Sequence, residues 1–272
     1  NCGPENTVTI NGVRCTGGAD GGEKRVHCTE ESLEKEHSFI DNAMPTTFSF
    51  KGLGCKCAKD RNMVYLSCPS GVDASSGDIG RTIDFRYAKL ENMKFDGANL
   101  EKAKFDYAVC KGCSFVGAEM SGADMSFAKM DDSNFSGAGL EGAGMDFMKA
   151  NGGNFTSANL KDVSADHGKF NGASFTGATM SDFDSDFGQF NGADLSDAVL
   201  SDASLTFAAM KGADLSRANL DSADLSHAGF SGATGFQSAT CSGATFDFMT
   251  CPSGKSVGVF QKGCDPGESC AA

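Results

Sequence analysis

A period of five residues runs unbroken through the middle of the chain, and it restricts the possible folds more than any other feature. From Ile83 the chain divides into 30 blocks of five, and the third residue of each block, here called its centre, runs from Phe85 to Phe230. Ten centres are Phe, ten are Leu and six are Met, and the residue two places before the centre is Ala in 20 of the 30 blocks. Most of the remaining positions are small or polar.

A period of five fits neither an α-helix, which repeats every 3.6 residues, nor an extended strand, which repeats every two. It fits a coil in which each block forms one short side and then turns a corner. The centre and the small residue before it point inward, while the polar residues face solvent. Successive coils then pair their backbones at about 4.8 Å per layer, so that each layer buries its neighbours.

The blocks resemble the pentapeptide-repeat family, whose consensus is A(D/N)LXX. The resemblance covers about residues 83–251, and four blocks match directly: Ala193-Asp194-Leu195, Ala213-Asp214-Leu215, Ala218-Asn219-Leu220 and Ala223-Asp224-Leu225. It implies an all-β fold, a right-handed quadrilateral β-helix (pentapeptide-repeat solenoid) with four blocks per coil. We therefore divide the chain into a Cys-rich N-terminal cap (1–80), the β-helix (81–251) and a Cys-containing C-terminal tail (252–272).

An aromatic column supports the four-block coil independently. The last residue of every fourth block is aromatic or histidine, and after a one-residue insertion between Phe230 and Phe236 the column continues. Its nine members, called the stripe below, are Tyr87, Tyr107, Phe127, Phe147, His167, Phe187, Phe207, His227 and Phe248. At the layer spacing they would line one outer edge for about 40 Å.

A second column, made of inward centres, predicts a filled core. Phe95, Phe115, Phe135, Phe155 and Phe175 recur every fourth block and are expected to stack. Where a centre is small, the inward residue before it is enlarged: Met148 precedes Ala150, Val163 precedes Ala165, and Phe183 precedes Ser185. Because protein interiors are packed near crystal density, this compensation predicts a core without a channel or an interior ligand pocket.

The stripe is the most informative functional feature, because soluble monomers rarely leave so long an apolar strip in water. Lys129, Lys149 and Lys169 are expected along one flank, with Asp146, Asp166 and Asp186 along the other. A hydrophobic strip with charged rims is typical of an interface. The alternative is a self-stacked ladder that lies flat on the solenoid or is covered by the chain's own flanking segments.

The chain has twelve cysteines, and ten of them lie towards its two ends. Ten are disulfide candidates and indicate caps that are crosslinked in an oxidising compartment: Cys2, Cys15, Cys28, Cys55, Cys57, Cys68, Cys241, Cys251, Cys264 and Cys270. Reduced cytosolic thiols or a metal site are the alternatives. Cys110 and Cys113 both point inward; two buried free thiols are the favoured interpretation, and a bond between adjacent sides is the other.

These cysteines predict a secreted, extracellular protein, with the periplasm or the thylakoid lumen as alternative oxidising compartments. The sequence starts at Asn1 without a signal-like apolar stretch, which we interpret as a processed chain. Two N-glycosylation sequons, at Asn134 and Asn154, fall on one side in consecutive layers. Outside the repeat, residues 8–13 predict two strands around an Asn-Gly turn, residues 30–37 a short helix, and the tail an irregular loop.

No motif points to catalysis. Cys55, Cys57 and Cys68 have an odd spacing for a zinc site, and the glycine-rich residues 17–24 lack the GK[ST] of a phosphate loop. The four histidines are scattered, and a convex rod offers no cleft that would shift the pKa values of paired carboxylates. A column of outward aspartates (162, 182 and 202) could hold Ca²⁺, but solvated surface charge is the simpler interpretation. We expect no enzymatic activity, no cofactor and no metal.

The net charge of −13 argues against direct nucleic-acid binding, and no apolar run is long enough to span a membrane. The leading hypothesis is an extracellular structural or interaction protein. Its rod would bind another protein, a glycan, or copies of itself in a filament or coat. An alternative implied by the resemblance is an acidic DNA mimic that binds and inhibits DNA gyrase, which mostly free thiols would favour. A third is an enzymatic or metal-binding role in residues 1–80, which no motif supports.

Overall fold

The computed structural model describes the backbone of four short strands and, with side chains, Ala74 and residues 84–256. The strands form two antiparallel hairpins: β1 (Thr7–Ile10) pairs with β2 (Val13–Thr16), and β3 (Lys56–Asp60) with β4 (Met63–Ser67). The first hairpin confirms the prediction around the Asn-Gly pair, and the second was not predicted. The helix expected at residues 30–37 and most of the tail lie outside the described residues.

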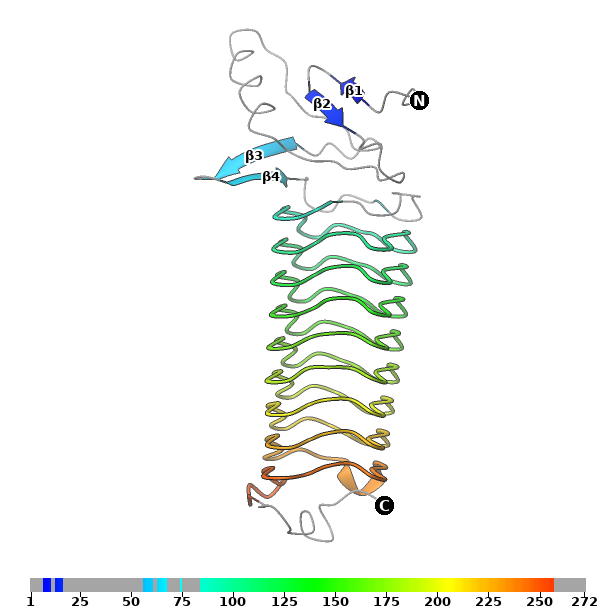
Figure 1. Cartoon of the computed structure of the whole chain (residues 1–272), viewed down its shortest axis with the longest axis vertical. Helices are drawn as coiled ribbons and strands as arrows, with labels where there is room; N and C mark the ends of the chain where they lie inside the picture. Colours follow the sequence, from blue (N-terminus) through cyan, green and yellow to red (C-terminus); the bar gives the residue numbers. More distant parts are fainter. Residues whose placement is uncertain are drawn as a thin grey trace.

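From residue 84 the chain winds into a straight stack of four-sided coils (Figure 1). The residue before each centre forms a parallel bridge with its equivalent 20 residues later, as in Asp84–Lys104 and Lys104–Asp124. Four blocks therefore complete one coil, which confirms the predicted β-helix. We number the sides by their first centres: Phe85 on the first side, Leu90 on the second, Phe95 on the third and Leu100 on the fourth.

Backbone hydrogen bonds join the coils at every side. On the fourth side, the N–H of Leu100 donates to the carbonyl of Glu119 (2.7 Å), and the N–H of Glu119 donates back to Ala98 (3.0 Å). At the corner, Lys102 donates to Ser121 in the next coil (2.9 Å), while Ala103 donates to Leu100 and closes a turn within its own coil (2.9 Å). The coils therefore pair without long strands, because each side forms a few backbone hydrogen bonds with the same side of the next coil.

The consensus Asp or Asn before the centre also has a structural role. Its Oδ1 accepts a hydrogen bond from the backbone N–H two residues later, at 2.9 Å in Asp194–Ser196, Asp214–Ser216 and Asn219–Asp221. Short side chains that bond to the backbone in this way stabilise turns. This bond explains why Asp and Asn recur at a position that faces solvent.

The core is solid. Along the column from Phe95 to Phe175, neighbouring rings stack with centroids 4.8–5.1 Å apart. The three size-compensated pairs, such as Phe183 with Ser185, are fully buried. These observations confirm the prediction of a filled interior in which total side-chain volume is conserved.

The one-residue insertion is taken up at a single corner. Bridges span 20 residues up to Asp214–Thr234 and 21 residues from Asn219–Thr240 onward. The 3₁₀ helix η1 (Phe236–Ser238) lies at this step and begins after Gly235, whose φ is 83°. Phe236 and Cys251 then lie in the core, while Cys241 and Phe246 are partly buried against it.

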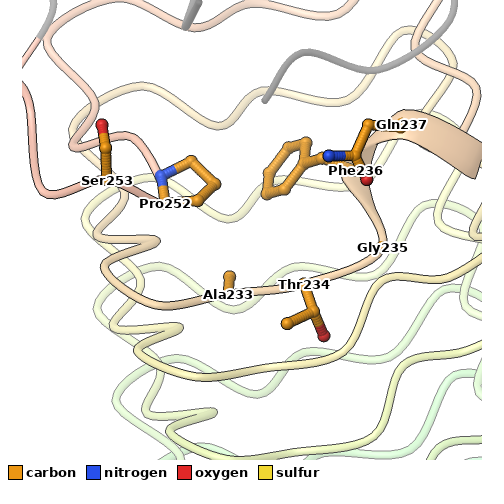
Figure 2. A pocket seen from close by; sticks show the side chains of 7 residues that line it. All are labelled: Ala233, Thr234, Gly235, Phe236, Gln237, Pro252 and Ser253. Atoms are coloured by element: carbon orange, nitrogen blue, oxygen red, sulfur yellow. The ribbon is translucent and has the colours of Figure 1, made fainter. Parts of the chain in front are cut away.

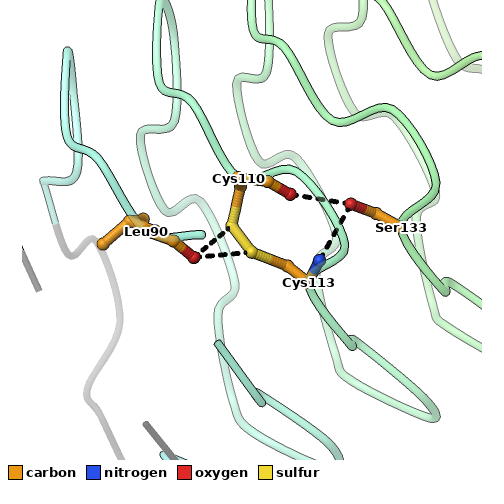
Figure 3. Close-up of a disulfide and its surroundings, with 4 residues drawn as sticks. All are labelled: Leu90, Cys110, Cys113 and Ser133. Carbon is orange, nitrogen blue, oxygen red and sulfur yellow. Dashed lines mark hydrogen bonds between the residues drawn. A yellow bond between two sulfur atoms is a disulfide. The ribbon is translucent and has the colours of Figure 1, made fainter. Parts of the chain in front are cut away.

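Cys110 and Cys113 form a disulfide across one corner (Figure 3), so the favoured prediction of two free thiols is wrong. The corner brings their Cα atoms to 5.5 Å, which suits such a bond. Both sulfurs lie near the carbonyl oxygen of Leu90 in the preceding coil, at 3.7 and 2.8 Å. In the following coil, the buried hydroxyl of Ser133 donates to the Cys110 carbonyl (2.7 Å) and accepts from the Cys113 N–H (3.2 Å).

Candidate functional site

The stripe forms one continuous outer edge between the first and second sides. All nine side chains are exposed, the seven Tyr and Phe residues to between 40% and 50%. Each ring stacks on the next with centroids 4.3–5.0 Å apart, from Tyr87 to Phe248 across the insertion. The outward column is therefore confirmed. Its rings stack on one another, which is the ladder that the alternative interpretation expected. The described residues do not cover this ladder, so its rings are open to solvent.

The backbone beneath the stripe makes its aromatic composition unusual. Every stripe residue adopts a left-handed conformation, with φ between 56° and 63°. Bulky residues rarely accept this conformation. The equivalent positions at the other three corners carry Gly, Asp, Asn, Ser or a basic residue. The fold itself therefore does not require an aromatic ring here.

The two sides that meet at the stripe have opposite charge. Between residues 84 and 226, the outward positions of the first side carry eight aspartates against Arg86 and Lys104, a net charge of −6. Those of the second side carry six lysines against Glu91 and Asp131, a net charge of +4. The predicted flanks are thus correctly placed, because Lys129, Lys149 and Lys169 are bridged in one column.

The acidic flank is held by hydrogen bonds between layers. The Asp146 Oδ1 accepts from the Asp166 N–H (3.0 Å), and the Asp186 Oδ1 accepts from the Thr206 N–H (3.1 Å). Partial desolvation raises the pKa of the largely exposed Asp184 above its usual range, and the neighbouring Asp166 and Asp186 carboxylates raise it further. Like charges are therefore crowded along this side.

Replacing Asp184 with Asn is expected to stabilise the protein by a few tenths of a kcal/mol at pH 7, since the side chain is exposed and its interactions are screened. A carboxyl whose pKa is raised in the folded state opposes folding above that pKa, and the cost disappears as the pH falls through it. The gain should therefore shrink towards pH 4. Urea unfolding at both pH values measures it, with Asp202→Asn as the control for net charge. A gain that grows as the pH falls would contradict the assignment.

A pocket of about 320 Å³ lies at the insertion, with the rings of Phe236 and Pro252 on either side (Figure 2). Its lining contains no charged side chain: Ala233, Thr234, Gly235, Phe236, Gln237, Pro252 and Ser253. Within the residues that the structure describes, no three His, Cys, Asp or Glu side chains are grouped to hold a metal ion, and no helix is long and apolar enough to cross a membrane.

The remaining predicted residues have mixed outcomes. Asn134 and Asn154 are half-buried neighbours in consecutive layers, and their Oδ1 atoms accept from the N–H groups of Ser136 and Thr156 (both 3.0 Å). Their glycosylation stays a prediction. Cys241 and Cys251 are disulfide-bonded. The other predicted disulfide cysteines lie where the structure describes no side chains: Cys2, Cys15, Cys28, Cys55, Cys57, Cys68, Cys264 and Cys270.

Comparison with known proteins supports the fold. The sequence model of the protein family described as pentapeptide repeats matches the chain in eight copies. The matched residues include 83–122, 102–137, 118–156, 188–217, 198–234 and 213–247. A trypsin-treated structure of QnrB1, a plasmid-mediated fluoroquinolone resistance protein, is similar with a TM-score of 0.51 at 14% identity, covering 58% of this chain and 84% of that one. This similarity concerns the fold alone. No curated protein sequence matches the chain.

Two further solved structures are more remote in shape. HetL, a pentapeptide repeat protein involved in heterocyst differentiation regulation in Nostoc sp. strain PCC 7120, is 25% identical over 69% of this chain and 86% of its own, with a TM-score of 0.36. A pentapeptide repeat protein from the Arabidopsis thaliana thylakoid lumen is 24% identical over 43% of this chain and 68% of its own, with a TM-score of 0.27.

Proposed function

Because this chain belongs to the pentapeptide-repeat family, whose coils build a straight and solid rod, we propose that it is a non-enzymatic interaction protein that associates side by side with another protein surface through the stripe. The rod holds the contact surface rigid over its whole length. The stripe, rather than an interior cavity, is the functional site.

One observation supports this proposal above the others: nine exposed aromatic or histidine rings occupy left-handed backbone positions in successive coils. Each ring costs free energy twice, through its backbone conformation and through its apolar surface in water. Strained positions that persist are commonly found at functional sites. Burial of the rings against a partner would offset the second cost.

The disulfides favour an oxidising compartment for this interaction, and we propose that the protein is secreted. Cys110 and Cys113 are bonded to each other inside the rod, and Cys241 and Cys251, near its end, each take part in a disulfide. Disulfides persist in secreted proteins and are rare in the cytosol. Assembly into a filament or coat would be one outcome of such side-by-side contacts.

The acidic DNA mimic that inhibits gyrase is the second candidate. The net charge of −13 supports it. The aromatic stripe has no role in this function, however, because mimicry of a DNA backbone needs a regular array of negative charge. One side that flanks the stripe is acidic and the other is basic. This arrangement fits an interface with complementary charges better than it fits a uniformly acidic DNA mimic.

A photo-crosslinking phenylalanine analogue at position 147 tests the proposal in the protein's native extract. The matched control places the same analogue at Ser157, which is exposed, left-handed and half a coil away on the opposite corner. We expect protein adducts from position 147 and few from position 157. Changing Phe127, Phe187 and Phe207 to Ser should reduce the adducts about tenfold. Equal labelling from both corners would contradict the proposal.

The serine variant should keep its fold, so that a loss of adducts reports on the surface. Serine already occupies the same left-handed corner position at Ser157 and Ser222. The change therefore replaces exposed rings without a new backbone requirement. An unchanged far-ultraviolet spectrum and a cooperative unfolding transition would verify this, with the midpoint lowered by about 10 °C or less for the loss of three rings.

A further inference from the structure

We infer that the partner of the stripe is the stripe of a second copy of this chain, with the two rods side by side and parallel. This inference rests on the proposed function and adds the identity and the orientation of the partner. The contact would be isologous, with the same surface on both copies and a twofold axis along the rods.

The repeat distance of the stripe favours a second copy. Its rings follow one another at 4.3–5.0 Å, set by the backbone pairing of the coils. A partner that meets all nine rings must repeat at the same distance along the whole edge. A second β-helix of this chain has that repeat at every layer, whereas an ordinary globular surface does not.

The charges beside the stripe determine the orientation. When two rods meet edge to edge and run parallel, the twofold axis places the first side of each copy opposite the second side of the other. The side of charge −6 then faces the side of charge +4 at both rims. In an antiparallel pair, each side would face its own equivalent, acidic against acidic and basic against basic. Rims of opposite charge attract each other and fix the register of an interface, whereas rims of like charge repel each other and oppose association.

The layers of charge also coincide in height. Asp146 and Lys149 lie on either side of Phe147 in one coil, and Asp166 and Lys169 lie on either side of His167 in the next. A parallel twofold axis preserves height along the rod, so Lys149 of one copy faces Asp146 of the other. The same holds for Lys169 and Asp166. Each exposed pair contributes little by itself, but all act in the same direction.

The size of the surface predicts a weak dimer. The stripe runs for about 40 Å at the layer spacing, and the columns at positions 146 and 149 are three residues, or roughly 10 Å, apart. The contact therefore buries on the order of 400 Å² per copy. This lies near the lower limit for specific protein interfaces. We expect a dissociation constant in the micromolar range or weaker, and concentration-dependent dimerisation.

Sedimentation velocity over a concentration series tests the inference with two variants of the full chain. Asp146, Asp166 and Asp186 are changed to Asn, which keeps the Oδ1 acceptor of each, and Lys129, Lys149 and Lys169 are changed to Gln. A parallel pair predicts that both variants dimerise about fivefold to tenfold more weakly, because both remove attraction across the rims. An antiparallel pair predicts that both dimerise more tightly, because both remove repulsion.

The two variants change the net charge in opposite directions, so a general charge effect would give them opposite signs. A third variant, Glu101, Glu119 and Glu141 to Gln, repeats the charge change of the aspartate variant on the fourth side, which does not meet the stripe. It should dimerise like the wild type. Tighter dimerisation of the rim variants would overturn the parallel orientation. A monomer at all concentrations whose position-147 analogue labels a different protein would overturn the inference and leave the proposed function standing; no labelling specific to position 147 would overturn both.

Discussion

Replacing Phe135 with Ala is expected to lower the free energy of unfolding by about 3–5 kcal/mol. The ring is fully buried and stacks between Phe115 and Phe155, with both centroids at 4.8 Å. The backbones above and below are fixed by interlayer hydrogen bonds, so the coils cannot move inward to fill the cavity. Urea unfolding followed by circular dichroism measures the loss.

Phe127→Ala is the matched control. The Phe127 ring also stacks on both faces, 4.8 Å from Tyr107 and 4.8 Å from Phe147, but it is 43% exposed. The comparison therefore separates burial from stacking. We expect the exposed variant to lose about 1 kcal/mol, the scale of aromatic pairs at partly solvated sites. Similar losses at the two positions would mean that the centre of the rod is not a closed core.

Gly235→Ala is expected to destabilise the last coils by about 2–4 kcal/mol. A Cβ at this position would overlap the backbone nitrogen of Ser216 in the preceding coil and lie 2.6 Å from its Cα. These are backbone atoms of a hydrogen-bonded layer, which cannot move aside as a flexible side chain would. Hydrogen exchange of the amides after residue 215 measures the loss.

Gly212→Ala provides the control, because it has a similar backbone with open space around it. Its φ is 67°, and a Cβ there would meet no atom within 4 Å. Only the cost of a left-handed alanine remains, about 1 kcal/mol. If the two variants lose the same stability, the close approach of Gly235 to Ser216 is not what requires glycine at the insertion.

The sequence predicts the repeat region well because the same pattern of inward and outward residues recurs in every coil. The nine stripe residues and the inward Phe column both report a 20-residue coil, and the bridges confirm it. The insertion before Phe236 could also be placed, since the column resumes at Phe248 only if one residue is removed from the count. Repetition averages out the ambiguity of any single block.

Features that occur once were harder to predict. The β3–β4 hairpin has no repeated partner and no Asn-Gly turn signal, so the sequence does not predict its five-residue strands. The Cys110–Cys113 bond depends on how closely a corner brings two inward positions together, which the block pattern does not specify. The sequence does not predict the left-handed backbone of the stripe, because bulky aromatic residues rarely adopt this conformation.

The four-block coil also limits how a protein of this kind can change its length. Duplication or loss of one block would keep every centre inside, so the rod would still fold. All rings beyond that point would, however, move to the next corner, and the stripe would break into two shorter edges facing different directions. Only steps of four blocks lengthen the edge itself, so a lineage that depends on this surface would gain or lose whole coils.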